Sequence, residues 1–207
     1  MKKLSTDNPF FDFMGDVGDY MLINILFILT SLPIITVGMS LTAMYRMALR
    51  KKRNESNYII REYFQICKEE WKQSTKLWII FLISGALLVF DVVYTKNLWG
   101  GLFGIALGCI ITLWSFLFSY VFPLQARFEN TIKDTIKNAL ILSVRYLPYT
   151  VIIVVLNAIP VVCIAGGVFT TRMAMPIYFF FGFSFTARIN SIFFEKIFGR
   201  LINEEEI

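Results

Sequence analysis

The sequence predicts an all-α, polytopic membrane protein, and both its composition and its charge distribution favour that class. Of 207 residues, 57% are hydrophobic and only 17% are charged, whereas a soluble domain carries roughly 25% charged residues. Three stretches of 26, 30 and 26 residues contain no Asp, Glu, Lys or Arg, namely 20–45, 97–126 and 146–171. A helix needs roughly 20 mostly apolar residues to cross a bilayer, so these stretches are long enough to span a membrane.

We expect a single integral membrane domain over residues 1–207, with about five transmembrane helices and two cytoplasmic amphipathic helices. The amphipathic helices are expected at about 58–76 and 128–145, because apolar side chains recur there at helical spacing beside Lys and Arg. The sequence leaves open whether the fifth hydrophobic block crosses the membrane completely. The five expected spans are residues 20–45, 77–95, 99–122, 146–171 and 173–194.

The distribution of Lys and Arg predicts the orientation of these spans. Five crossings divide the intervening segments between two sides, of which one holds sixteen Lys and Arg and the other four. Short loops rich in Lys and Arg stay in the cytoplasm. The sequence therefore predicts an N-terminus outside and a C-terminus in the cytoplasm.

Two of the expected spans contain helix-disrupting residues. Pro33 and Gly38 lie in the first span and Pro160 in the fourth, and a proline inside a helix removes a backbone hydrogen bond and kinks it. These positions are expected to be helix kinks. Interrupted spans can also border a transport pathway, and that alternative stays open.

A repeated glycine spacing opens the third expected span. Gly100, Gly104 and Gly108 recur every four residues, and small residues at this interval let helix backbones approach closely in lipid. We expect these residues to serve helix packing, either within the chain or between protomers of a homo-oligomer.

The residues required by common catalytic and metal sites are absent from the sequence. There is no histidine and no G-x-x-x-x-G-K-[ST] phosphate loop, and the three cysteines lie far apart. We therefore expect no enzymatic activity, no cofactor and no metal. The net charge of +5 follows from the bias toward positively charged cytoplasmic loops, so the expected partner is the lipid bilayer and no nucleic acid is expected.

Asp91 is the only carboxylate inside an expected span. Charged groups within a membrane are costly and often mark ion pathways. Asp91 is therefore the candidate intramembrane polar site, with either a proton- or cation-coupling role or a structural one.

Three segments of the chain resemble the YesL family of bacterial integral membrane proteins: "LTSLPIITVGMSLTAMYRMALR", "YIIREYFQICKEEWKQSTKLW" and "FPLQARFENTIKDTIKNALILSVRYLP". The family has no established activity, and its members resemble companions of carbohydrate uptake systems. The resemblance implies a multi-pass protein of the bacterial cell (inner) membrane. It further implies an accessory or regulatory subunit of a carbohydrate ABC importer, with permease or ATPase subunits as partners. The alternative is an independent small-molecule or ion-coupled transporter, with a pathway at the kinked spans one and four and Asp91.

The resemblance also directs attention to the second amphipathic segment. Permease subunits of sugar importers carry a coupling helix that docks on the ATPase, and its acidic residues and closing Leu-Pro are similar to those found here. A helix lying on the lipid surface is the alternative. The candidate partner-docking residues are Glu129, Ile132, Asp134, Ile136, Leu147 and Pro148.

Overall fold

The computed structural model describes residues 9–52, 58–95 and 101–205, and all regular secondary structure within those ranges is helical. This confirms the all-α fold class. The elements are α1 (Pro9–Ser31), the 3-10 turn η1 (Ile34–Thr36), α2 (Val37–Lys52), α3 (Ile59–Tyr94), α4 (Leu102–Arg127), α5 (Ile132–Arg145), α6 (Leu147–Ala165), α7 (Val168–Ile177), the π-helical turn η3 (Tyr178–Gly182) and α8 (Phe183–Glu205).

The expectation of one continuous span over residues 20–45 is wrong, because the chain breaks at Pro33. Helix α1 ends at Ser31 and α2 begins at Val37. Proline has no N–H to donate, and it disfavours helical geometry in the residue before it. The Thr36 hydroxyl stabilises the break by donating to the carbonyl oxygens of Thr30 (2.6 Å) and Pro33 (2.7 Å). Pro33 thus separates two helices and does not kink one.

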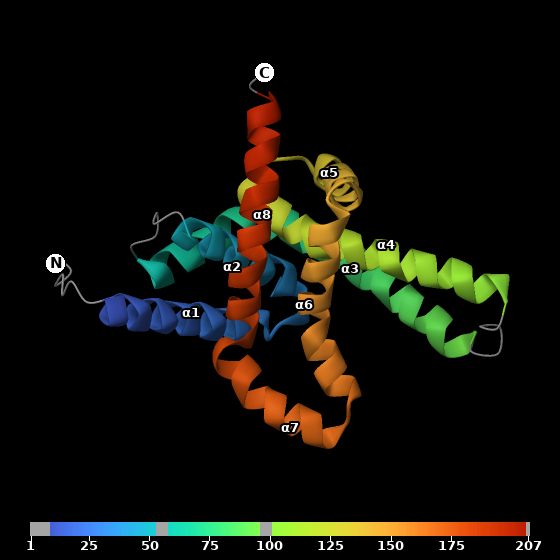
Figure 1. Ribbon diagram of the computed structural model, residues 1–207, viewed down its shortest axis with the longest axis horizontal. Coiled ribbons are helices and arrows are strands. Elements are labelled where there is room, and N and C mark those ends of the chain that lie inside the picture. Colours follow the sequence, from blue (N-terminus) through green and yellow to red (C-terminus); the bar gives the residue numbers. More distant parts are fainter. Residues whose placement is uncertain (1–8, 53–57, 96–100, 206–207) are drawn as a thin grey trace.

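Helices α1 and α2 form a hairpin. Figure 1 shows them running in opposite directions, with the start of α1 and the end of α2 both at the left. The tip of the hairpin is apolar and exposed at Leu32, Ile34 and Ile35. It is attached to α3 by the Trp78 indole, which donates to the Ile34 carbonyl at 2.7 Å.

Helix α3 combines two expected elements in 36 continuous residues. The sequence predicts an amphipathic helix at 58–76 followed by a separate span at 77–95, and that division is wrong. No Gly or Pro occurs between Ile59 and Ser84, so nothing ends the helix where it changes from amphipathic to apolar.

The second half of the chain follows the expected order more closely. Helix α4 occupies the third span, and α5 occupies most of the second amphipathic segment. Helix α6 ends before Gly166 and Gly167, the latter with a φ of 100° that favours glycine. The fifth block consists of α7, η3 and α8 in succession.

The helices are arranged as a central bundle with a projecting arm. In Figure 1, α6 and α8 run alongside each other, α7 connects their lower ends, and α3 and α4 extend together to the right. Aromatic side chains fill the centre: Phe194 packs against Tyr120 at 5.2 Å and against Phe198 at 5.5 Å between ring centroids. This core joins α4 to α8.

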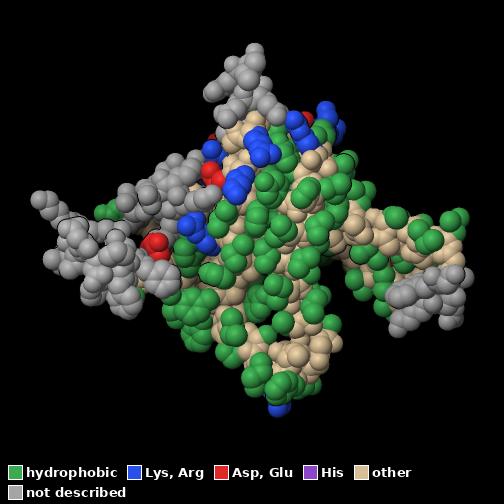
Figure 2. Space-filling view, viewed as in Figure 1, with side chains coloured by type: hydrophobic (Ala, Val, Ile, Leu, Met, Phe, Trp, Pro, Cys, Tyr) green, Lys and Arg blue, Asp and Glu red, His purple; other side chains and the backbone are tan. Residues whose placement is uncertain are grey.

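Among the described residues, five helical segments are long and apolar enough to cross a membrane: those within α1, α3, α4, α6 and the α7–α8 unit. Figure 2 shows Lys and Arg gathered at the top and upper left, whereas hydrophobic side chains cover most of the visible lower part and the arm. The molecule is therefore a multi-pass membrane protein by length and composition, with its basic residues concentrated at one end.

Candidate functional site

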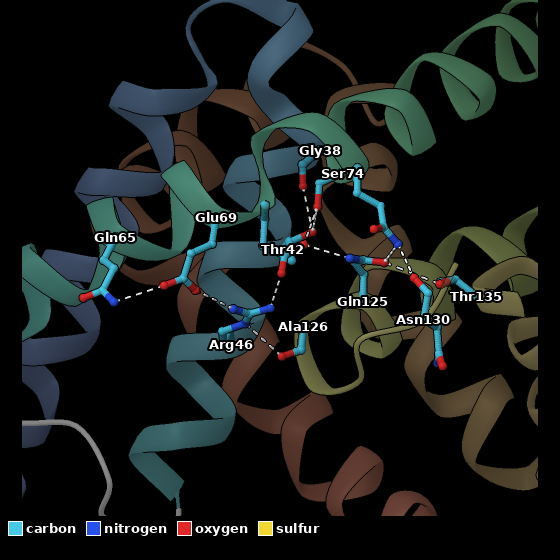
Figure 3. Close-up of polar contacts among 12 residues, drawn as sticks. Gly38, Thr42, Arg46, Gln65, Glu69, Ser74, Gln125, Ala126, Asn130 and Thr135 are labelled. Atoms are coloured by element: carbon cyan, nitrogen blue, oxygen red, sulfur yellow. Dashed lines mark hydrogen bonds and ion pairs between the residues drawn. The ribbon is translucent and has the colours of Figure 1, made fainter. Parts of the chain in front are cut away.

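A buried ion pair joins α2 to α3 at the basic end of the molecule. Arg46 of α2 contacts Glu69 through Nη1 (3.2 Å) and Glu70 through Nη2, and its Nε donates to the Ala126 carbonyl at 3.0 Å. The side chains of Arg46 and Glu70 are only 13% and 10% exposed. Because a buried charge is stable only when paired, Arg46 holds α2, α3 and the last turn of α4 together (Figure 3).

Glu70 is stabilised from two further directions. Gln125 of α4 donates to its Oε2 at 2.7 Å, and the Ser74 hydroxyl lies 3.5 Å from the same oxygen. Ser74 in turn is hydrogen-bonded to Thr42 of α2 at 2.9 Å. Both carboxylate oxygens of Glu70 are therefore satisfied, and α2, α3 and α4 are connected through one acidic side chain.

The same cluster extends to the start of α5. Gln73 donates to the Gln125 side-chain oxygen at 2.9 Å and to the Asn130 carbonyl in the α4–α5 linker. Thr135 of α5 also donates to that Gln125 oxygen, at 3.4 Å. Figure 3 shows Gln125 of α4, Asn130 of the linker and Thr135 of α5 lying close together. We call this set the Arg46 cluster; it comprises Thr42, Arg46, Glu69, Glu70, Gln73, Ser74, Gln125 and Thr135.

The Arg46 cluster is built to fix geometry. Its carboxylates accept from a guanidinium, an amide and a hydroxyl, and these contacts connect different helices. Within the described ranges, no group of three or more Cys, Asp or Glu could hold a metal ion. The arrangement is suited to positioning α5 relative to the transmembrane helices.

Gly38 is needed for the close approach of α2 and α3 beside this cluster. A Cβ at Gly38 would collide with the Trp78 Cβ and the Ser74 carbonyl oxygen. Gly38 lies in the first turn of α2, so it does not kink a span as expected. Its role is to bring Thr42 within hydrogen-bonding distance of Ser74.

A second polar group lies deeper, among apolar residues. Asn190 of α8 donates to the Tyr45 hydroxyl (3.2 Å) and to the Asn157 side-chain oxygen (2.8 Å), and Asn157 donates to Ser119 at 3.2 Å. This chain joins α2, α8, α6 and α4. Hydrogen bonds between helices in a membrane stabilise their packing, and this chain has that role.

Asn24 of α1 holds the π-helical turn η3. Its amide donates to the carbonyls of Tyr178 (3.0 Å) and Phe179 (2.7 Å), and its side-chain oxygen accepts from the Ser184 N–H at 2.9 Å. A π-helical turn departs from the regular α-helical hydrogen-bond pattern. Asn24 pairs with two carbonyls within this turn and with an N–H at the start of α8, and so fixes the junction of α7 and α8.

The residues of the expected transport pathway are not brought together. Asp91 is exposed near the end of the α3–α4 arm, whereas Pro33 lies at the tip of the α1–α2 hairpin. Pro160, which lies inside α6, borders two partly open pockets of about 160 and 280 Å³, and neither Asp91 nor Pro33 lines them.

The structure divides the six expected docking residues into two sets. Ile132 and Ile136 are partly buried against the core, so they are less available to a partner than the sequence predicts. Asp134 is exposed, but it also completes the N-terminal cap of α5, where Thr131 Oγ1 donates to it at 2.5 Å. Exposed positions in and next to this region are Glu129, Leu147 and Pro148.

Gly108, one of the regularly spaced glycines of α4, packs against no other helix in the described part of the chain. A Cβ added there would have no atom within 4 Å. Gly104 is partly exposed in the first turns of α4, and Gly100 lies outside the described residues. Packing between protomers stays a prediction.

Sequence reasoning missed the Arg46 cluster and the buried amides. Arg46 begins a basic segment that has the composition of a solvated loop, so its burial is not expected. The acidic pair Glu69–Glu70 lies among basic residues and could have indicated an ion pair with an Arg or Lys elsewhere in the chain. Asn24 and Asn157 each lie among apolar residues within a charge-free stretch. An isolated amide side chain in such a stretch indicates an interhelical hydrogen bond.

The fold and these sites together define a polytopic, all-helical membrane protein whose basic end is fixed by a buried ion-pair cluster. Residues 20–92 match a family described as "Protein of unknown function, DUF624". The matched segment includes α2 and the three charged residues of the Arg46 cluster. No curated protein and no solved structure matches the chain.

Proposed function

We propose that the protein is a non-enzymatic accessory or regulatory membrane subunit that works beside a carbohydrate ABC importer of a bacterial cell membrane. The sugar-importer context comes from the resemblance to the YesL family, which the DUF624 match over residues 20–92 supports. The observation that carries the proposal is the anchored helix α5, whose outer face is exposed.

Helix α5 is attached to the bundle by its inner face. Thr135, Ala139 and Leu142 are buried, and Thr135 joins the Arg46 cluster through Gln125. Helices that only rest on lipid need no such polar attachment to the protein. The attachment fixes which residues of α5 point outward.

The outward residues form one continuous stripe, which we call the α5 outer face: Lys133, Lys137, Leu140, Ile141 and Val144, all exposed. Their spacing of three and four residues places them on one side of the helix. Apolar residues at this spacing can contact a helix or groove of a partner protein. The flanking Lys side chains favour a partner whose contact surface has acidic residues at its rim.

The hairpin changes the proposed orientation of the N-terminus. The N-out expectation assumed one span over residues 20–45, but α1 and α2 are antiparallel (Figure 1). Arg46 of α2 pairs with the part of α3 that precedes its apolar half, and basic ends stay in the cytoplasm. The N-terminus is therefore proposed to lie on the cytoplasmic side, as is the C-terminus, with the α1–α2 hairpin entering and leaving from that side.

Thiol labelling in intact cells tests this orientation. In a variant lacking the native cysteines, Ser5→Cys should resist an impermeant reagent, as should the reference Arg200→Cys near the end of α8. Arg172→Cys on α7 should react. Labelling of Ser5→Cys equal to that of Arg172→Cys would restore the N-out arrangement.

Co-purification tests the functional proposal. The tagged protein, extracted from its native host in a mild detergent, should carry permease or ATPase subunits with it, and Ile141→Asp should remove them. The matched control is Ile110→Asn on α4, which changes an exposed apolar residue of the arm. Recovery of the protein alone, or equal recovery of partners with Ile141→Asp, would contradict the proposal.

A further inference from the structure

A hollow of about 500 Å³ lies beside the amphipathic half of α3. It is lined by Phe64, Lys68, Trp71 and Lys72, by Glu69 and Cys67 of the same helix, and by Met39 of α2. Phe64 and Trp71 are 46% and 47% exposed, although both rings are large and apolar. The hollow thus combines aromatic walls, an apolar base and two cations.

The cations at this hollow have no partner within the part of the chain that the structure describes. Neither Lys68 nor Lys72 forms an ion pair among the described residues, and Glu69, the acidic residue of the lining, is paired with Arg46. The Trp71 indole is also free to donate, whereas those of Trp78 and Trp114 are bonded to Ile34 and Ser84. The hollow therefore offers three unused donors and a net positive charge.

The position of these donors along α3 matches the headgroup layer of a bilayer. The apolar half of α3 begins at Leu77, five residues after Lys72, which is roughly 7.5 Å along a helix. The headgroup region on each side of a bilayer is about 5–8 Å thick. Lys72 and Trp71 thus fall where lipid phosphates lie, and Trp is the residue that anchors helices at this depth.

We propose that this hollow is a binding site for one anionic phospholipid. Lys68 and Lys72 bind the phosphate, the Trp71 N–H donates to the ester or headgroup oxygens, and Met39 packs against the start of the acyl chains. An acidic peptide fits less well, because the lining residues Trp71 and Lys72 lie within about two helical turns of the apolar half of α3, which a bilayer surrounds. This site lies on α3 and is independent of the α5 outer face.

Native mass spectrometry tests the site with defined lipids. The full-length protein in detergent is mixed with equal amounts of phosphatidylglycerol and phosphatidylethanolamine, and the bound lipid is counted. One Lys near an anionic surface changes binding about fivefold, so Lys68→Gln with Lys72→Gln should lower the preference for phosphatidylglycerol ~30-fold. Lys68→Arg with Lys72→Arg should retain it.

The matched control is Lys133→Gln with Lys137→Gln on α5, which removes the same charge from another exposed surface of the basic end. It should leave the lipid preference within twofold of the wild type. An unchanged preference in the Lys68/Lys72 glutamine variant, or an equal loss in the α5 control, would overturn the proposal. Circular dichroism of each variant establishes that the helices are intact, and a preference lost only together with helicity would also overturn it.

Discussion

Replacing Arg46 should cost more stability than replacing any exposed charge of the protein. In Arg46→Ala, Glu70 keeps Gln125 and Ser74 as donors but loses the cation that pairs with it among the described residues, at a site where its side chain is 10% exposed. Leaving one partner of a buried pair uncompensated costs about 3–5 kcal/mol. We expect a loss of that size in the free energy of unfolding.

Glu69 provides the matched control for this prediction. It contacts the same guanidinium at 3.2 Å, but its side chain is 48% exposed, so solvent screens the pair. Exposed ion pairs contribute about 0.2–1 kcal/mol, and Glu69→Ala should therefore cost less than about 1 kcal/mol. The two variants separate the effect of burial from the effect of charge.

The assay is unfolding in mixed micelles of dodecyl maltoside and sodium dodecyl sulfate, followed by tryptophan fluorescence. The double variant Arg46→Leu with Glu70→Leu should be more stable than Arg46→Ala, because removing both charges leaves no uncompensated ion. The reasoning is refuted if Arg46→Ala is no less stable than Glu69→Ala, or if the double variant is the least stable of the three.

Three further substitutions test other parts of the structure. Gly38→Val should destabilise the protein by at least about 2 kcal/mol, because overpacked side chains force backbone shifts. The control Gly108→Ala, in open space, should leave the free energy of unfolding unchanged. Equal effects of the two substitutions would refute the close α2–α3 contact. Asn24→Leu removes the donor of two carbonyls and should cost about 2–4 kcal/mol in the same unfolding assay, so wild-type stability would refute the clamp on η3. Asp91→Asn should leave both stability and any glycan-utilisation phenotype intact, since Asp91 is exposed and lines none of the cavities described; loss of the phenotype at normal protein levels would favour ion coupling.

The helical fold could be predicted from the sequence because it depends on local composition. Charge-free runs and helical spacing are visible residue by residue, although the expected fourth span over residues 146–171 extends past Gly166 and Gly167, before which α6 ends. The consequence of Pro33 could not be predicted, because a proline within an apolar run either kinks or ends a helix, depending on which donors reach the carbonyl oxygens left without an N–H partner. Here Thr36 and Trp78 supply those contacts.

The candidate site was less predictable, because it depends on contacts between distant residues. Arg46 is separated from Glu70 by 24 positions, and Gln125 from Glu70 by 55. Nothing in the sequence of the basic segment distinguishes Arg46 from the Arg and Lys residues that follow it. The partial burial of Ile132 and Ile136 likewise depends on which face of α5 turns toward the bundle, and Thr135 and Gln125 determine that face.

The most direct test of the central claim is photo-crosslinking from the α5 outer face in living cells. A benzophenone amino acid placed at Ile141 should form adducts with a permease or ATPase subunit of a carbohydrate importer, whereas the same probe at Ile110 on the α3–α4 arm should not. Adducts from residue 141 with lipid alone, or the same protein adducts from both positions, would contradict the account.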